Sequence, residues 1–449
     1  MRFCVLAHTQ RLDSYGCRRL PPSAQMRGLL RHSLGLILLL SLCVVHDSRA
    51  QSLLGSTSLG EEGRFGGRSS LLQAGRPRTL ETLLSSLYGG NGISLAVASG
   101  HAPHFTVSST AAINQLNKQI ASEIGVFPFT SSQGGFTYGF DAKQGTFVRT
   151  TQTLGPLFAE KAATLGRGKL SVNTAYTFYT FNRFNGESLD NLRVTAQHQP
   201  DVLGEPETRE SFEQDTILIA LDLSLRVRLL SLAATYGVTD RLDIGILVPI
   251  VNVNMSVKAN ARVLTSPENP IPEVHTFTGA PTSPVDEQQR SATGIGDVIL
   301  RAKYHLFDSE FADVAAGLLA KFSTGDASNF LGTGTTSLRP VVILSRTFAG
   351  VFTPHLNLGY EFNLDRGLRD SLEYAAGFDV GSEQFTVAFD VLGTYRPRDD
   401  NGRHVINGSL GAKWNPFRQF VLFLNAQVPL NDAGLRANLV TTFGAEYTF

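Results

Sequence analysis

Apolar and polar residues alternate along most of the chain after residue 169, and the pattern is clearest at its end. From Leu435 to Phe449 the odd-numbered positions are apolar apart from Thr441, while the even-numbered positions are mainly polar. Successive side chains of a strand point to opposite faces of the sheet, so the pattern predicts a strand with one apolar and one polar face. About ten residues of this alternation, with aromatic residues near the ends, are typical of a membrane β-barrel strand.

Three aromatic residues of that segment, Phe443, Tyr447 and Phe449, share its apolar face. Their arrangement resembles the membrane-insertion signal on the last strand of outer-membrane barrels. We therefore expect the segment to close a barrel and to bind the barrel-assembly machinery.

The same alternation recurs upstream, which gives about twelve predicted strands in all. Short connections such as residues 239–241 and 349–350 alternate with generally longer ones. In membrane barrels the short turns lie on the periplasmic side, and an even number of strands leaves both termini there. The predicted strands are 170–178, 217–228, 242–249, 297–306, 312–323, 338–348, 352–363, 372–380, 385–395, 409–414, 419–428 and 435–449.

These strands predict an all-β fold, a transmembrane antiparallel up-and-down β-barrel over residues 169–449 with an N-terminal periplasmic extension. Two stretches between strands, residues 182–213 and the proline-containing residues 252–293, are predicted as surface loops. The alternative is a soluble β-sandwich. It is disfavoured because an exposed sheet face would not carry so many Phe and Tyr residues in register.

The first 50 residues have the pattern of an export segment. Arg27 and Arg31 precede the apolar run 34–45, and Ser48-Arg49-Ala50 provides a small-x-small cleavage site. This order predicts a secretory signal peptide over about residues 26–50, cleaved after Ala50, with Met1 or Met26 as the start. A single membrane anchor is the alternative, but the apolar run is short for one.

Residues 51–133 are predicted to form a flexible or short-helix segment, either periplasmic or placed in the barrel as a plug. Ile113, Leu116, Ile120 and Ile124 fall at helical spacing, which predicts an amphipathic helix. Docking on the barrel, entry into the lumen and simple periplasmic packing all stay open. Residues 134–168 are predicted to form a hairpin followed by the lead-in to the first strand.

Composition excludes several classes of function. The 39 basic and 39 acidic residues cancel, so nothing in the charge points to a nucleic-acid partner. The hydrophobic content of 42% suits a barrel whose lipid-facing residues are diluted by a polar lumen. Cysteines occur only at Cys4, Cys17 and Cys43, so cleavage after Ala50 would leave no disulfide or thiolate metal site.

Charged residues on the polar faces are the candidate lumen-lining positions. Mixed charge in a lumen tunes which solutes pass, whereas cross-strand pairing that merely solvates a closed interior is the equally weighted alternative. No single residue is assigned a substrate contact. The candidates are Asp222, Arg226, Arg228, Asp297, Arg301, Lys303, Lys321, Glu361, Glu373, Asp379, Asp390, Lys413, Arg436 and Glu446.

Enzymatic chemistry finds little support in the sequence. His305 and His355 lie on polar faces, where paired lumen residues are commoner than ligands or bases. No G-x-S-x-G elbow, phosphate-binding loop before a helix or EF-hand loop is present. We therefore expect no catalytic site, no cofactor and no metal.

Five phrases resemble a known family. They are 155–160 (GPLFAE), 164–169 (TLGRGK), 236–243 (YGVTDRLD), 294–298 (GIGDV) and 301–304 (RAKY). Together they are similar to the outer-membrane family named for the meta-pathway of phenol degradation, over about residues 134–449. The resemblance implies an outer-membrane barrel associated with the movement of aromatic or other hydrophobic compounds, and it supplies no set of substrate-binding residues.

The sequence thus predicts an exported channel in the bacterial outer membrane, in contact with its lipid, that passes small hydrophobic solutes, aromatic ones among the candidates. The alternative is a non-conducting structural or adhesive barrel that acts through its extracellular loops. Deletion of the long loop would separate the two, because a channel would still conduct and an adhesin would lose its partner.

Overall fold

The computed structural model describes much of the chain beyond residue 78. The predicted export segment and most of residues 51–133 lie outside the described residues. The described ranges are 79–87, 95–97, 116–117, 120–124, 131, 135–141, 143–144, 146–150, 152–197, 215–267, 275–277, 285–365, 370–397, 404–417 and 419–449.

Twelve antiparallel strands form a closed barrel, as the sequence predicted. Each strand pairs with the next along the chain, and β19 returns to pair with β4, with Phe443 opposite Tyr176 and Glu446 opposite Asn173. The barrel strands are β4 (Leu170–Phe184), β7 (Thr216–Gly237), β8 (Leu242–Leu264), β11 (Val298–Asp308), β12 (Asp313–Phe322), β13 (Ser337–Ser345), β14 (Phe352–Asn363), β15 (Ser371–Gly381), β16 (Phe385–Tyr395), β17 (His404–Phe417), β18 (Phe420–Pro429) and β19 (Leu435–Thr448).

The two ends of the barrel differ in their connections. At the end where β4 begins, the strands are joined by short turns such as 309–312 and 382–384, and we call it the turn end. The opposite loop end carries longer connections, in the alternation that the sequence predicted. The smaller elements are α2 (Glu81–Ser85), β1 (Leu95–Val97), β2 (Tyr138–Asp141), β3 (Thr146–Arg149), β5 (Glu187–Ser188), η2 (Leu189–Asn191), β6 (Leu192–Gln197), β9 (His275–Phe277), β10 (Val285–Ile295) and η4 (Ala327–Asn329).

Exposed apolar side chains cover the outer face of the barrel wall and form a belt suited to lipid. In the described part of the chain, no helix has the length and hydropathy needed to cross a membrane. Belt residues include Leu232, Tyr236, Leu300, Tyr304, Leu318, Val342, Leu356, Leu358, Phe378, Phe389, Leu410, Trp414, Leu424 and Phe443.

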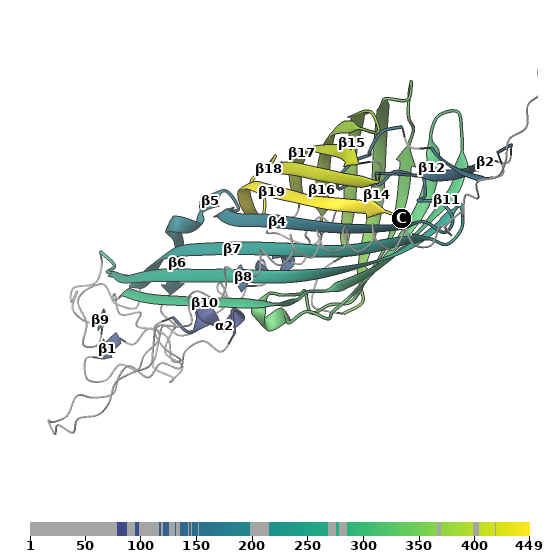
Figure 1. Ribbon diagram of the computed structural model, residues 1–449. Helices are drawn as coiled ribbons and strands as arrows, with labels where there is room; N and C mark the ends of the chain where they lie inside the picture. The colour runs from purple at the N-terminus through teal and green to yellow at the C-terminus, as the bar shows by residue number, and fades with distance from the viewer. Residues whose placement is uncertain are drawn as a thin grey trace, which may run out of the picture. The chain divides into compact units, whose positions relative to one another are not determined.

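Strands β7 and β8 are 22 and 23 residues long, and they extend past their neighbours at the loop end (Figure 1). We call the parts of these two strands toward the loop end, residues 216–229 and 250–264, the wing. At its edges β6 pairs with β7, and β10 pairs with residues 250–260 of β8. The predicted surface loops 182–213 and 252–293 were therefore too long, because parts of both belong to strands that widen the wing.

The wing has an apolar inner face. Leu223 and Leu225 of β7 and Val253 and Met255 of β8 are buried in one cluster with the helical elements of the N-terminal region. That cluster also contains Leu83 and Leu84 of α2 with its N-cap residue Leu80, and Leu116, Ile120 and Ile124 of a second helical stretch. Of the amphipathic helix predicted from Ile113, Leu116, Ile120 and Ile124, the last three residues therefore pack against the inward face of the barrel strands. Ile113 lies outside the described residues.

Candidate functional site: the lumen and its strap

Residues 152–167 cross the inside of the barrel near the turn end, and we call this segment the strap. Its backbone is held by side chains from several strands. Leu154 N donates to Thr386 Oγ1 at 2.9 Å, and Ala162 N donates to Ser345 Oγ at 2.9 Å. Asn357 holds Glu160 from both sides, because its Oδ1 accepts from the Glu160 N–H at 2.6 Å and its Nδ2 donates to the Glu160 carbonyl at 2.9 Å.

The strap leaves the lumen beside the β7–β8 turn. Thr164 Oγ1 donates to the carbonyl of Asp240 at 2.6 Å, and Leu165 N donates to Asp243 Oδ2 at 2.9 Å. Gly237 allows this approach, because a Cβ there would meet the Gly166 carbonyl. Two of the family-like phrases, residues 164–169 and 236–243, therefore meet at this anchorage.

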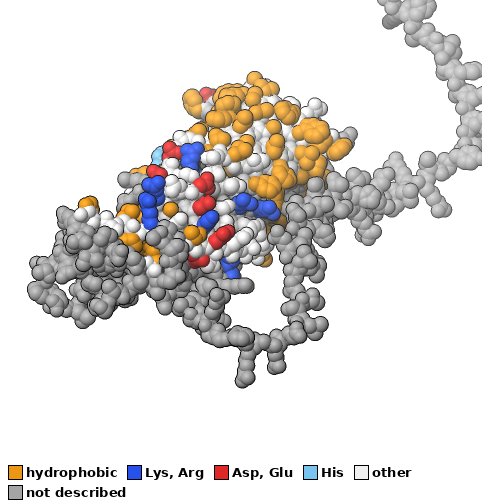
Figure 2. All heavy atoms as spheres, turned by 90° about the vertical axis from the view of Figure 1, so that its left-hand side faces the viewer, with side chains coloured by type: hydrophobic (Ala, Val, Ile, Leu, Met, Phe, Trp, Pro, Cys, Tyr) orange, Lys and Arg blue, Asp and Glu red, His pale blue; other side chains and the backbone are white. Residues whose placement is uncertain are grey.

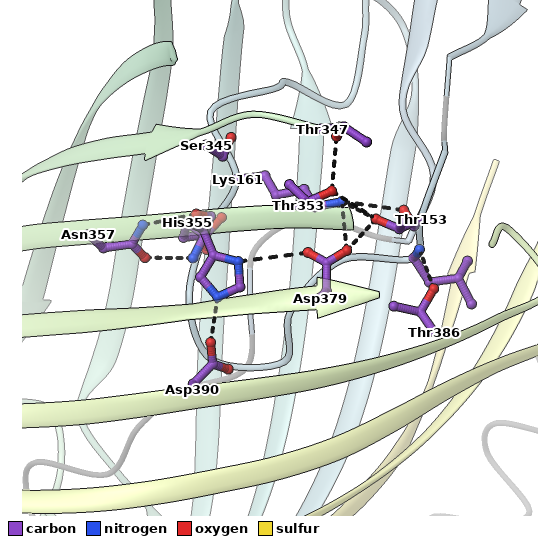
Figure 3. Close-up of polar contacts among 12 residues, drawn as sticks. Thr153, Lys161, Ser345, Thr347, Thr353, His355, Asn357, Asp379, Thr386 and Asp390 are labelled. Atoms are coloured by element: carbon purple, nitrogen blue, oxygen red, sulfur yellow. Dashed lines mark hydrogen bonds and ion pairs between the residues drawn. The ribbon is translucent and has the colours of Figure 1, made fainter. Parts of the chain in front are cut away.

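A buried polar cluster ties the start of the strap to β14, β15 and β16 (Figure 3). Lys161 Nζ lies 3.4 Å from Asp379 Oδ2, and Thr153 Oγ1 donates to the same oxygen. On the other side, His355 Nε2 lies 2.5 Å from Asp390 Oδ1, and its Nδ1 lies 3.7 Å from Asp379 Oδ1. Burial lowers the pKa of Lys161, and the Asp379 carboxylate opposes that shift.

A second charged cluster joins the strap to β11. Glu160 Oε1 lies 3.5 Å from Arg301 Nη1, and Glu160 Oε2 lies 3.4 Å from Lys303 Nζ. Lys303 also donates to the Lys161 carbonyl at 3.3 Å and lies 4.0 Å from Asp243. One carboxylate of the strap therefore faces two cations of the wall.

Farther from the strap, wall charges pair with each other. Lys321 Nζ lies 3.0 Å from Glu361 Oε1, whose carboxylate also accepts from Ser337 Oγ at 2.5 Å. Arg339 and Glu373 form another ion pair. These contacts run between side chains of β12, β13, β14 and β15, so they cross-link the lumen wall.

A cavity of about 200 Å³ lies inside the barrel beside these charges. Phe158 of the strap provides aromatic surface, while aliphatic side chains line much of the rest. A second, more polar cavity of about 440 Å³ lies between the strap and the turn end, and its lining includes Thr137, Thr150 and Arg346. Aliphatic residues of the first cavity are Ile299, Leu319, Val341, Ile343, Leu392 and Val405.

Most of the predicted lumen positions are buried or half-buried on the inner face, and the strap brings many of them together. Outside the two clusters, Lys413 Nζ donates to the Leu154 carbonyl at 3.2 Å, and Glu446 accepts from Gly135 N. Arg436 Nη2 donates to Asn407 Oδ1 at 2.7 Å, nearer the loop end. Asp297 instead organises a loop, because it accepts from the N–H groups of Gly325 and Thr333.

Three predicted lumen positions lie elsewhere. Asp222, Arg226 and Arg228 are exposed on the outer face of the wing, the face that carries exposed Leu232 and Tyr236 lower on the same strand. The reason is that the alternate apolar positions of β7 are buried inward against the N-terminal helices. Figure 2 views the molecule from the wing end, where charged side chains gather, with hydrophobic ones on the wall behind.

The sequence missed several site residues. Glu160 and Lys161 lie in the irregular strap, where periodicity carries no signal, and Asp243 is the second residue of β8 beside a tight turn. All three lie in or next to family-like phrases. Arg339 was missed because Pro340 and the following apolar run obscure the alternation of β13. His355 was noted only as a paired polar residue, and its two carboxylate neighbours come from β15 and β16.

The predicted insertion-signal residues lie on β19 and at its end. Phe443 is 40% exposed in the belt, and the rings of Tyr447 and Phe449 lie 4.6 Å apart. Their role in assembly stays a prediction. Among the described residues, no group of three or more His, Cys, Asp or Glu side chains is placed to hold a metal ion.

Solved structures similar to this chain include porins and channels, at low similarity. The NanC porin has 10% identity and a TM-score of 0.34, with 61% of this chain and 98% of that chain covered. The toluene transporter TbuX of Ralstonia pickettii has 12% identity and a TM-score of 0.33, covering 63% and 90%. The CymD monoaromatic hydrocarbon channel has 10% identity and a TM-score of 0.32, covering 63% and 89%. Likenesses this weak carry no argument about the site.

No curated protein matches the chain. A family model does match, over residues 224–436. This range is narrower than the residues 134–449 predicted from the motifs, because it leaves out the strap, the first strand and most of the last strand. Residues 224–436 match the family described as "Putative MetA-pathway of phenol degradation", which confirms the resemblance carried by the motifs.

Proposed function

We propose that the protein is a passive outer-membrane channel for small hydrophobic compounds, aromatic ones among the candidates, without a catalytic step. The observation that carries this proposal is the lumen cavity, which combines Phe158 of the strap with an aliphatic wall within the barrel. Ligand sites typically join apolar walls with a few placed polar groups. The family description, which refers to phenol degradation, is consistent with such a substrate class.

The outer face of the barrel supports a location in the outer membrane. The apolar belt suits a bilayer, and the closed barrel leaves no unpaired strand edge around its circumference at the belt. The turn end is then periplasmic and the wing extracellular. The predicted export segment would deliver the chain to this membrane.

The strap is the barrier that a solute must pass. The contacts named for Thr153, Leu154, Glu160 and Ala162 run through side chains of the strands, without a backbone ladder. Neutral hydrogen bonds contribute about 0.5–1.5 kcal/mol each and bonds to charged groups about 1.5–3 kcal/mol, so these contacts can exchange one by one without unfolding the wall. We therefore assign the strap the role of a movable closure.

Reconstitution tests the proposal. The mature chain is placed in vesicles with lipopolysaccharide in the outer leaflet, and folding is verified by heat-modifiable mobility. Entry of phenol and of a sugar of similar size is measured above the rate of protein-free vesicles. Preferential entry of phenol supports the proposal, whereas entry of neither solute through folded protein contradicts it.

The alternative, an adhesive or structural barrel, is tested by a deletion. Residues 252–264 and 285–293 belong to strands of the wing, so the deletion must be confined to residues 268–284. A channel retains phenol entry after this deletion. A barrel that acts through its loops loses its partner and shows no entry before or after the change.

A further inference from the structure

We propose that the lumen cavity binds a small aromatic compound that carries an acidic group, such as an aromatic carboxylate, and that this group contacts Arg301 and Lys303. The inference rests on the proposed function and deepens it, because it names the substrate class of the same cavity. It makes the preferred solute an organic anion with an apolar ring.

The size of the cavity limits its occupant. Its volume of about 200 Å³ lies below the range of about 300–1,000 Å³ that drug-sized ligands occupy. A single aromatic ring with a short substituent suits this space. Phe158 can contact the ring by offset or edge-to-face packing, and the aliphatic wall can contact its other face.

The charged side chains that line the cavity indicate the charge of the ligand. The lining contains four basic side chains, Arg301, Lys303, Lys321 and Arg339, and three acidic ones, Glu160, Glu361 and Glu373, so basic groups exceed acidic ones by one. Asp243 lies outside this lining, 4.0 Å from Lys303. Within the lining, Arg301 and Lys303 share the single carboxylate of Glu160, and a ligand carboxylate beside them would supply a second acceptor.

The distances between charged atoms show which ion pairs of the lining are the longest. Lys321 and Glu361 approach to 3.0 Å, which is close to a charge-assisted hydrogen bond. Glu160 instead divides its oxygens between Arg301 at 3.5 Å and Lys303 at 3.4 Å. Charge-assisted bonds normally measure about 2.7–2.9 Å, so an incoming carboxylate can approach either cation more closely than Glu160 does.

The side chains themselves suit a carboxylate. The Arg301 guanidinium presents a planar fork that matches two carboxylate oxygens, and the Lys303 ammonium supplies a compact charge beside it. Ile299 lies on the same strand and also lines the cavity, so the acid and the ring meet different parts of one wall. A ligand acid at this position competes with Glu160 of the strap.

Because the acid of the ligand and Glu160 compete for the same cations, two substitutions should change carboxylate affinity in opposite directions. Arg301→Gln removes a cation from the acid site and should weaken binding of a carboxylate. Glu160→Gln removes the competing carboxylate and should strengthen it. If the cluster only held the strap in place, the two changes would act in the same direction.

The experiment measures binding to the folded, full mature chain in detergent micelles by isothermal titration calorimetry. Benzoate is compared with benzamide, which has the same ring and a neutral polar group. We expect benzoate to bind about tenfold more tightly, the range of one hydrogen bond to a charged group. Arg301→Gln should weaken benzoate about tenfold and leave benzamide unchanged, while Glu160→Gln should tighten benzoate several-fold.

Matched variants serve as controls. Arg226→Gln removes the same kind of charge from the outer face of the wing, where the side chain is exposed, and should leave both affinities unchanged. Lys303→Gln should repeat the effect of Arg301→Gln if that variant fails to fold. Equal binding of benzoate and benzamide, or weakening by both Arg301→Gln and Glu160→Gln, would overturn the inference.

The outcomes are separable from those of the proposed function. Phenol entry without any preference for benzoate over benzamide supports the channel and contradicts the acid site. Benzoate binding without entry of any solute supports the acid site and contradicts the channel.

Discussion

The wing and the barrel wall use the same alternation of apolar and polar residues with opposite orientation. On the wing, Leu223 and Leu225 point inward to a buried cluster, while Asp222 and Arg226 are exposed outside. On the wall, Leu424 is exposed on the belt, and charged residues such as Lys321 are buried inside. Alternation therefore establishes that a strand has two faces, but the material that covers each face decides which one is inward.

Substitution of a charged residue should give the largest difference in stability between the wall, where charges are buried, and the wing, where they are exposed. Lys321 and Glu361 are only 9% and 10% exposed, so Lys321→Met leaves a buried carboxylate without its nearest cation. We expect a loss of about 3 kcal/mol in the free energy of unfolding. Urea unfolding, followed by the mobility shift of folded barrels on gels, measures the loss.

Two controls accompany that variant. Arg226→Met, on the outer face of the wing, should change the free energy of unfolding by less than about 0.5 kcal/mol. The double variant Lys321→Met/Glu361→Leu should recover most of the stability, since replacement of a whole buried pair is often neutral. A wing variant as damaging as the wall variant would contradict the assigned orientation.

The outer faces should differ next in their tolerance of charge. Leu424 is 58% exposed on the belt, and Leu424→Arg should cost about 2–4 kcal/mol if it lies at the bilayer midplane. Leu264 is 39% exposed at the end of the wing, where Leu264→Arg should cost less than about 1 kcal/mol. The free energy of folding into vesicles measures both, and equal costs would place the wing in the lipid.

Much of the wall could be predicted from sequence because lipid and water impose a period of two. The strand predicted at residues 352–363 is β14, Phe352–Asn363, and the one predicted at 385–395 is β16, Phe385–Tyr395. Each strand obeys the same local rule, so its bounds follow without knowledge of its neighbours. The closed barrel then follows from the number of strands.

The site could be predicted only in part. Arg301 and Lys303 stand out on a polar face, but their partner Glu160 lies in an irregular strap about 140 positions earlier, at separations of 141 and 143 residues. No local pattern encodes a contact of that separation. The orientation of Asp222 was equally inaccessible, because it depends on helices that cover the inner face of the wing.

Removal of a hydrogen bond should have a smaller effect, and one that differs between the strap and the wing. Asn357 makes two bonds to the backbone of Glu160, and Asn357→Leu should loosen the strap by about 1–2 kcal/mol. Hydrogen exchange of the Glu160 amide should then become faster. Asn252→Leu removes a bond to Thr293 at the wing edge and should leave that exchange unchanged, whereas unaltered exchange in Asn357→Leu would contradict the anchoring role.

The smallest expected effect compares turns at the two ends of the barrel. Asn185 and Gly186 at the loop end have φ values of 49° and 87°, and Ala349 and Gly350 at the turn end have 50° and 73°. Type I′ turns require positive φ at both central residues, which Asn tolerates better than Ala. Ala349→Asn should therefore stabilise the barrel by about 0.5 kcal/mol. Asn185→Ala should destabilise it by more than that, because it also removes the bond that Gly434 N donates to Asn185 Oδ1 at 2.8 Å. Thermal unfolding of both variants measures the effect, and a loss of stability in Ala349→Asn would show that packing around that turn outweighs its backbone preference.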